Sequence, residues 1–318
     1  VLSRTASKIA LLVLLLSLFV VSFLAVTGVS YTERDGSSVS GIAAAEKLRR
    51  EKEKWSGYIT EDVLRRVIEE NDSVNQSPEA QSDNVTENNI AYSRKQGFSD
   101  IREMINLAFS DFQSYDYYRA DSVSAEEAGA LYENRVNSLK EWLSSDENAD
   151  TFTKAEKQYL IHAYEALDTP LYYTYADGWK TLLKYLPTLI MIVVLVTGFL
   201  VSGIFSSEFT LRADAVYFSS LCGRNRGVTA KIAAGFLLQC GIYWAVIVIY
   251  TAIILLSLGA EGGMCAVQAW QGGWKSFYNI TLFQDYVWTT MGGYVGDLFI
   301  LALAMMISAK TRSAVLSS

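Results

Sequence analysis

The chain has 318 residues, of which 51% are hydrophobic and 19% are charged, and its formal net charge is −7 at pH 7. Its three cysteines, Cys222, Cys240 and Cys265, fall in different parts of the chain, which excludes a fold stapled by disulfides. The acidic balance gives no reason to expect a nucleic-acid partner.

Four nearly uncharged stretches contain much of the apolar content. They cover residues 9–29, 186–205, 233–258 and 287–309. Each is about 20 residues or longer, which is the length that a helix needs to cross a bilayer. We therefore predict a multi-pass membrane protein with helical spans in segments 1–30, 185–206, 232–258 and 287–309. The remaining segments are 31–184, a loop 207–231, a second loop 259–286 and the end 310–318.

The first span follows Arg4 and Lys8, a basic start that also suits a signal peptide. Its apolar stretch of about 21 residues exceeds the usual 7–15 of a signal sequence, so we favour an uncleaved anchor. The chain starts at Val1 and ends in the polar stretch "SAKTRSAVLSS". We expect further sequence beyond both ends.

Segment 31–184 holds 18 Lys and Arg against 29 Asp and Glu, a net charge of −11. Capping boxes at Ser124–Glu127 and Thr153–Glu156 predict two helix starts. Apolar residues recur at helical spacing in "SDIREMINLAF", with Ser99 as the expected cap. Further helices are predicted over residues 40–56 and 60–70, and no strand pattern appears. We therefore expect an all-α domain.

Residues 71–89 contain only two sizeable apolar side chains, so we expect a mobile loop there. Tyrosines gather in "FQSYDYYRAD" and "LYYTYADGW". Either cluster could meet a ligand or partner, and the second, Tyr172–Trp179, is more typical of an aromatic belt at the lipid headgroups.

The short connections carry their basic residues on one side. That side holds Arg4, Lys8, Arg212, Arg224, Arg226, Lys231, Lys310 and Arg312, against Lys275 alone in loop 259–286. The positive-inside rule places the richer side in the cytoplasm. Segment 31–184 is then extracytoplasmic, and both ends are cytoplasmic.

Motifs for covalent catalysis are missing from the sequence. His162 is the single histidine, which excludes a two-histidine zinc motif, and we expect it to be packed in a helix. No Gly-x-Ser-x-Gly, phosphate-binding Gly-rich loop or Cys-x-x-Cys occurs. We expect neither an enzyme nor a metal or cofactor bound by this chain.

Asp297 lies near the middle of the fourth apolar run. A central Asp costs about 2.5–3.5 kcal/mol on insertion scales, so such residues face the bundle or a wet cavity. It either lines a transport path or is a shielded structural acid. Gly292, Gly293 and Gly296 on the same run favour close helix packing.

The stretch "SSEFTLRADAVYFSSLCGRNRGVTAKI", residues 206–232, separates the second and third runs. Phe209, Tyr217 and Leu221 share one helical face, and "GRNRG" then breaks the helix. The stretch resembles the loop between spans two and three of ABC-2 type permeases, the membrane-spanning subunits of bacterial ABC transporters. Matching pieces are Glu208, "TLRADAVYFSSL", "GRNRG" and Lys231, and the resemblance extends over span one and residues 186–312.

The resemblance implies a subunit of an ATP-driven exporter in the bacterial plasma membrane. It implies as partners a separate ATP-binding cassette subunit, which holds ATP and Mg²⁺, and a second permease copy or homologous permease in the bilayer. Residues 207–231 of this chain would form a coupling loop that binds the ATPase. The residues expected to make that contact are Glu208, Phe209, Arg212, Tyr217, Leu221, Arg224 and Arg226. Asp297 would lie on the translocation path.

The chain departs from that family in having four spans rather than six. A complete four-span chain would resemble the MacB/FtsX class, in which a large outside domain transmits motion, although the "E-I-G" part of its loop is missing. A third possibility is a membrane-anchored receptor or scaffold, but three closely spaced spans exceed what anchoring needs.

Overall fold

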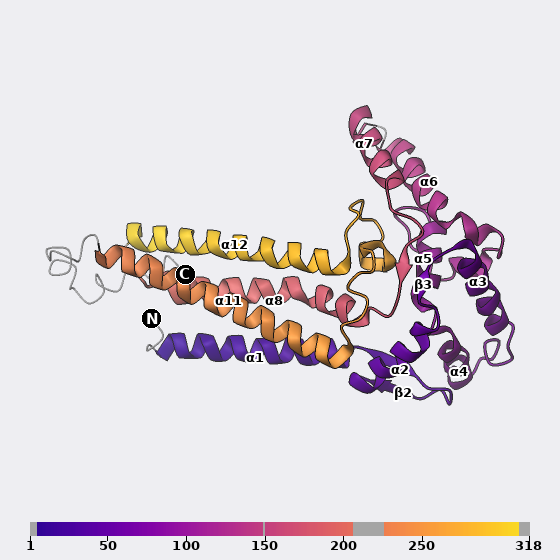
Figure 1. Ribbon diagram of the computed structural model, residues 1–318, viewed down its shortest axis with the longest axis horizontal. Coiled ribbons are helices and arrows are strands. Elements are labelled where there is room, and N and C mark those ends of the chain that lie inside the picture. Colours follow the sequence, from indigo (N-terminus) through magenta and orange to yellow (C-terminus); the bar gives the residue numbers. More distant parts are fainter. Residues whose placement is uncertain (1–4, 149, 206–225, 312–318) are drawn as a thin grey trace. The chain divides into compact units, whose positions relative to one another are not determined.

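The computed structural model describes residues 5–148, 150–205 and 226–311. Helices dominate this part of the chain, and four of them are long and apolar enough to cross a membrane (Figure 1). These four are α1 (Thr5–Thr27), α8 (Asp177–Ser202), α11 (Val228–Leu258) and α12 (Leu282–Thr311). Every predicted span is therefore a helix, and all four helices begin several residues earlier than the apolar run predicts.

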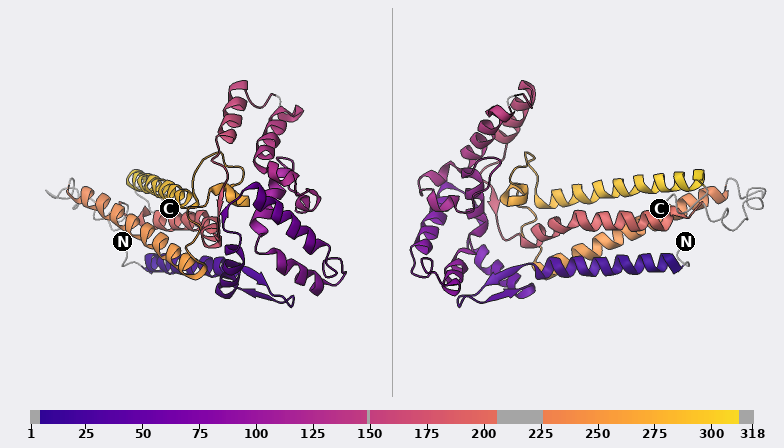
Figure 2. Two further views of the ribbon diagram at one scale, coloured as in Figure 1. Left: turned by 45° about the vertical axis from the view of Figure 1, so that its right-hand side comes forward. Right: turned by 180° about the vertical axis from the view of Figure 1, so that it is seen from behind.

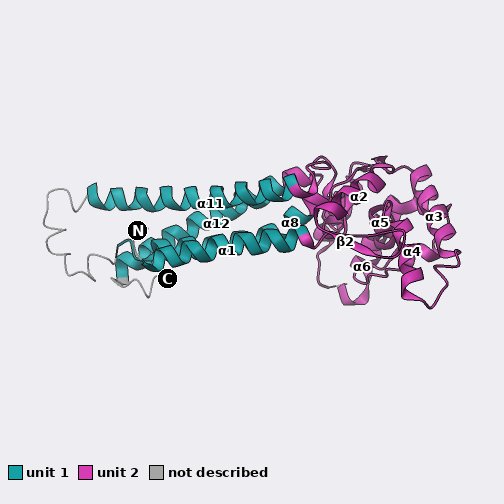
Figure 3. Cartoon of the chain, turned by 90° about the horizontal axis from the view of Figure 1, so that it is seen from below, with its two compact units in different colours: residues 1–26, 181–256, 286–318 teal, residues 27–180, 257–285 magenta. Residues whose placement is uncertain are grey.

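The chain forms two compact units, which Figure 3 distinguishes by colour. Unit 1 contains residues 1–26, 181–256 and 286–318, and unit 2 contains residues 27–180 and 257–285. The first therefore holds most of the four long helices. The second holds the large polar segment together with the connection between α11 and α12.

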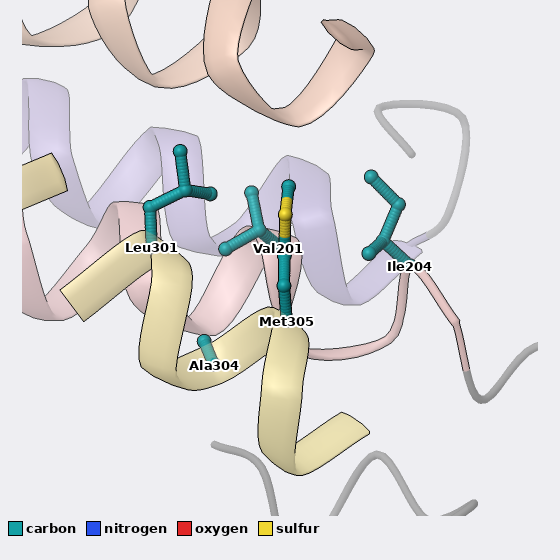
Figure 4. Packing of buried hydrophobic residues seen from close by; sticks show 5 residues of the cluster. All are labelled: Val201, Ile204, Leu301, Ala304 and Met305. Atoms are coloured by element: carbon teal, nitrogen blue, oxygen red, sulfur yellow. The ribbon is translucent and has the colours of Figure 1, made fainter. Parts of the chain in front are cut away.

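In unit 1 the long helices run alongside one another (Figure 2). At one end of the bundle, Val201 and Ile204 pack with Leu301, Ala304 and Met305 of α12 (Figure 4). A glycine lets α11 approach this cluster, because a Cβ atom on Gly235 would lie only 2.1 Å from the Met305 methyl carbon. A small residue of one helix thus packs against bulky residues of another, as is common between membrane helices.

Unit 2 is built from shorter helices around an apolar core. They are α2 (Ile42–Glu53), α3 (Glu61–Asn75), α4 (Val85–Lys95), α5 (Ser99–Phe109), α6 (Leu131–Ser144) and α7 (Lys154–Glu165). Residues at helical spacing on α3 and α5 fill the core, with Leu64, Ile68, Ile101 and Ile105 fully buried. The predicted helical pattern of this segment is confirmed.

The prediction that unit 2 has no strands is wrong. Strands β1 (Ser30–Thr32) and β2 (Ser38–Ser40) pair antiparallel, and so do β3 (Gly57–Tyr58) and β4 (Tyr172–Tyr173). Two or three residues are too few to show an alternating pattern in a sequence. Sheet content is nevertheless small.

Both predicted capping boxes are present. Thr153 and Glu156 bond reciprocally at the start of α7, and Ser124 and Glu127 do so ahead of η2 (Glu127–Ala130), a short 3₁₀ helix that leads into α6. The cap predicted at Ser99 is wrong, because its hydroxyl donates to the Gln96 carbonyl and Phe98 occupies the capping position.

The loop predicted over residues 71–89 is shorter than expected. Helix α3 continues to Asn75 and α4 begins at Val85, so residues 76–84 form the connection. Asn71 extends α3 because its side chain is fully buried and hydrogen-bonded to Arg102 and Asp121. A polar residue with long-range partners behaves as a core residue, which composition alone does not reveal.

Residues 257–285 fold as part of unit 2 rather than as a separate loop. Asn279 donates to the Ala166 carbonyl at 2.6 Å, and Tyr164 donates to the Lys275 carbonyl at 2.6 Å. The Trp179 indole donates to the Ala260 carbonyl at 2.8 Å. The connection between the third and fourth long helices is therefore bound along its length to the large polar segment.

Candidate functional site

Most residues predicted for the coupling loop lie outside the described residues. These are Glu208, Phe209, Arg212, Tyr217, Leu221 and Arg224. Arg226 is described, and it is exposed directly ahead of α11. The coupling role of all seven stays a prediction.

Asp297 is fully buried inside unit 1, on α12. Thr197 of α8 donates to its Oδ1 at 2.9 Å, and Gln239 of α11 donates to its backbone carbonyl at 2.5 Å. Three long helices thus each supply one polar side chain to the same point. We call Thr197, Gln239 and Asp297 the polar cluster.

Two oxygens of the polar cluster have no hydrogen-bond partner in the described part of the chain. They are Oδ2 of Asp297 and Oε1 of Gln239, and both are buried. Unpartnered buried oxygens leave this point of the bundle able to accept hydrogen bonds from water, a proton donor or a passing cation.

Helices α11 and α12 are joined by further polar contacts on one side of the polar cluster, toward the C-terminus of α11 and the N-terminus of α12. The Cys240 sulfur lies 2.8 Å from the Tyr294 hydroxyl, and Tyr243 donates to the Thr290 carbonyl at 2.7 Å. Close to the C-terminus of α11 and the N-terminus of α12, the hydroxyls of Thr251 and Tyr286 lie 2.9 Å apart. These contacts fix the register of two antiparallel helices, and so fix where Gln239 meets Asp297.

The glycines of α12 differ in how closely other helices approach them. A Cβ on Gly293 would lie 2.7 Å from the Tyr243 hydroxyl and 2.8 Å from Ile190, so Gly293 permits the contact of α12 with both neighbours. A Cβ on Gly292 or Gly296 would meet no atom within 4 Å. The expected close packing is therefore confirmed at Gly293 only.

A second charged site lies in unit 2, at the first turn of α8. Lys52 of α2 is 4% exposed, and its ammonium group lies 2.8 Å from Asp177 and 3.0 Å from Asp100. Lys180 lies 2.7 Å from the same Asp100 carboxylate, and the Tyr173 hydroxyl donates to Asp100 at 3.0 Å. We call Lys52, Asp100, Asp177 and Lys180 the ion network.

The ion network has equal numbers of cations and anions. Burial works to raise the pKa of the Asp100 carboxyl, but the ammonium groups of Lys180 and Lys52 outweigh it and hold the pKa below the ordinary value. Burial likewise works to lower the pKa of Lys52, and Asp100 and Asp177 together raise it above its usual range. Asp100 and Lys52 are therefore held in their charged forms at neutral pH.

After the polar cluster and the ion network, Arg135 of α6 is a third buried charged site. No carboxylate among the described residues pairs with it. It donates to the carbonyls of Trp274, at 3.2 Å, and Ser276, at 2.7 Å, and it stacks 3.9 Å from the centroid of the Tyr164 ring. Burial lowers the pKa of this guanidinium to about 10, which leaves it cationic at neutral pH. Its four hydrogen bonds join the carbonyls of Trp274 and Ser276 to α6 and to Tyr164 of α7.

The structure corrects two further predictions. His162 is exposed on α7, because the buried face of that helix is set by Tyr164. Tyr173, Tyr175 and Trp179 are buried in unit 2, where their polar atoms bond to Asp100, Leu258 and Ala260. They are core residues of this unit and not an aromatic belt. Tyr115, Tyr117 and Tyr118 of the first tyrosine cluster are exposed.

Thr197, Gln239 and the ion network were not identified from the sequence. Thr197 and Gln239 are polar residues inside apolar runs, so a search for such residues would have found them. Lys52 and Asp100 carry no such signal, because they lie in a segment where charged residues are common. Among the described residues, no group of three or more His, Cys, Asp or Glu is arranged to hold a metal ion.

Comparison with protein-family models gives no match, and neither curated proteins nor solved structures show a significant similarity to this chain. The fold and the clusters described above are therefore the basis for a functional assignment, together with the sequence of residues 206–232.

Proposed function

We propose that this chain is the membrane-spanning subunit of an ABC-2 type exporter, which couples ATP hydrolysis on a separate subunit to the export of a substrate. The observation that carries the proposal is the charged stretch 206–232, which connects two of the four helices able to span a membrane. The sequence of this stretch predicts an aromatic helical face followed by "GRNRG". A receptor or scaffold would not need three closely spaced spans for anchoring.

The composition of unit 2 supports the topology that this function requires. The positive-inside rule assigns residues 31–184 and 259–286 to the same, extracytoplasmic side. Residues 27–180 and 257–285 indeed fold into one unit, with backbone and side-chain hydrogen bonds between them. Two segments can fold together only on one side of a bilayer, which agrees with this assignment, and the proposal puts the basic stretch 206–232 on the opposite, cytoplasmic side.

The polar cluster supports transport through the bundle. Asp297 is buried among three helices, and one of its oxygens is free to accept a hydrogen bond. In the proposed mechanism the ATPase moves the loop between α8 and α11, and these helices carry Thr197 and Gln239. Any tilt of α8 or α11 against α12 would change how Asp297 is solvated. In this way the movement driven by the ATPase would be transmitted to the interior of the bundle.

The proposal predicts a reading frame for an ATP-binding cassette protein beside the gene, and it is tested by co-expressing the chain with that protein. Replacing Phe209, Tyr217 and Leu221 with Asp should abolish co-purification, because the contact face for the ATPase becomes charged. Ala215→Asp is the matched control, since it lies on the opposite side of the helix predicted for residues 209–221. Unchanged co-purification of the triple variant contradicts the coupling role.

A mechanotransmission permease of the MacB/FtsX class is the second candidate, and the ion network favours it. Residues 177–180 of α8 are held in unit 2 by Lys52 and Asp100, and the same helix continues into unit 1. Asp297→Asn separates the two candidates. It should stop export if the substrate passes the polar cluster, and it should leave activity unchanged if the bundle only transmits motion to unit 2.

A further inference from the structure

A cavity of about 350 Å³ opens in unit 2 around Trp55. Five parts of the chain meet there: the turn between β1 and β2, the end of α2, α3, α4 and the start of α5. Its charged lining residues are Arg34, Lys54, Arg66 and Arg94, with Glu51 and Glu70. The volume is within the range of sites that bind small molecules.

The rim of this cavity is positive although segment 31–184 carries a net charge of −11. Lys54 is neutralised by Glu51 at 2.6 Å, and Arg94 by Glu79 at 3.3 Å. Arg34 and Arg66 form no ion pair with any described residue. These two unpaired cations outnumber the one unpaired carboxylate of the described lining, Glu70, so the cavity keeps a net positive charge that suits a negatively charged group.

The floor of the cavity is aromatic. Trp55 is half-buried and meets the edge of the buried Phe98 ring, with 5.4 Å between the centroids. A Cβ on Gly97 would lie 3.1 Å from the Glu51 carbonyl and 3.4 Å from the Trp55 indole nitrogen, so glycine permits the close approach of this turn to the end of α2. The indole N–H has no acceptor among the described residues, which leaves a donor available to a ligand.

Arg66 is positioned by the same ring. Its guanidinium carbon lies 5.1 Å from the centroid of Trp55, a cation–π contact that holds a flexible side chain over the cavity. An arginine in this arrangement keeps donors free for two parallel hydrogen bonds to an anionic group. The flat face of Trp55 is suited to an apolar ring beside that group.

We propose that the cavity around Trp55 binds an organic anion, in which a phosphate or carboxylate group meets Arg66 and Arg34 and a flat apolar body lies against Trp55. This site is independent of the proposed transport function. It needs only that unit 2 is folded, because every lining residue belongs to that unit.

The test uses the full chain in dodecyl maltoside and saturation-transfer NMR with three probes. Phenyl phosphate and benzoate carry both an anionic group and a ring, and benzyl alcohol carries the ring alone. Both anions are expected to bind, and benzyl alcohol to bind about tenfold more weakly, because hydrogen bonds to charged groups are the strong ones. The ratio of phenyl phosphate to benzoate affinity identifies which anionic group is preferred.

Arg66→Gln should weaken phenyl phosphate binding about tenfold. Arg65→Gln is the matched control, since Arg65 is its exposed neighbour on α3, pairs with Asp62 and does not line the cavity. Trp55→Leu should weaken both anions and benzyl alcohol alike. Equal affinity in the Arg66 and Arg65 variants, or benzyl alcohol binding as tightly as the anions, overturns the proposal. Arg66 and Arg65 are both exposed, so a matching thermal unfolding midpoint excludes misfolding as the cause.

Discussion

The two units treat buried polar groups in different ways. In the described part of unit 1, Asp297 is the only carboxylate, and it is satisfied by one hydroxyl and left with one free oxygen. Unit 2 instead buries Lys52, Arg102 and Arg135 and surrounds each with several partners. The apolar bundle can therefore lose a polar contact at small cost, whereas unit 2 depends on the completeness of its charge networks.

This comparison predicts that the stability of unit 2 depends on pH. Arg102 donates to Asn71 at 3.0 Å and lies 3.0 Å from Asp121, and Asp121 accepts from Asn75 as well. Burial opposes the charge on Asp121, but Asn71, Asn75 and Arg102 hold the pKa of its carboxyl below the ordinary value. Together with the ion network, this gives unit 2 two places where protonation breaks buried pairs.

The largest expected effect is at Lys52. Lys52→Met should destabilise unit 2 by about 3–5 kcal/mol, because removing one partner of a buried pair leaves the other charges uncompensated. The measurement is the free energy of unfolding from urea denaturation of the full chain in detergent, followed by tryptophan fluorescence.

Lys54→Met is the control, since Lys54 is a neighbouring exposed lysine paired with Glu51. Exposed pairs contribute about 0–1 kcal/mol, so its effect should be near zero. Similar values for the two variants would show that unit 2 does not depend on its ion network, and the contrast between the units would be lost.

Protonation of the ion network at low pH should reduce the stability of unit 2 by a smaller amount. Because the pKa of Asp100 is lowered in the folded state, its stabilisation is complete above the pKa of an unfolded carboxyl, about 3.9, and is lost as pH falls through the folded value. Protonation of Asp100 weakens its pairs with Lys52 and Lys180 but removes neither side chain, so the loss is less than that of Lys52→Met.

The measurement is the thermal unfolding midpoint from pH 6 to pH 3. Asp100→Asn should lower the midpoint at pH 6 and flatten its fall below pH 4, because the group that titrates has been removed. Asp83→Asn, at an exposed position, should retain the slope of the parent chain. A parent-like slope in the Asp100 variant would assign the acid sensitivity of unit 2 to other carboxyl groups, such as Asp121.

The same contrast explains which features could be predicted from the sequence. The four spans follow from length and hydropathy alone, and Asp297 stood out because it is the one acid in an apolar run. The position of residues 257–285 in unit 2 could not be predicted, because it depends on Arg135, Tyr164 and Asn279, whose partners lie more than 100 residues away. Long-range polar contacts leave no periodic pattern in a sequence.

The smallest expected effect is at Thr197 in unit 1. Thr197→Val keeps the shape of the side chain and removes its hydrogen bond to Asp297, and such bonds between membrane helices average about 0.6 kcal/mol. Thr290→Val is the matched control, because the Thr290 hydroxyl donates only to Tyr286 and Val287 of its own helix. A double-mutant cycle with Asp297→Asn, measured as the free energy of unfolding in micelles, isolates the term between helices. A coupling of several kcal/mol would mean that the polar cluster is a structural lock like the ion network of unit 2. A coupling below 1 kcal/mol would agree with the proposed transport function, in which Asp297 changes partners.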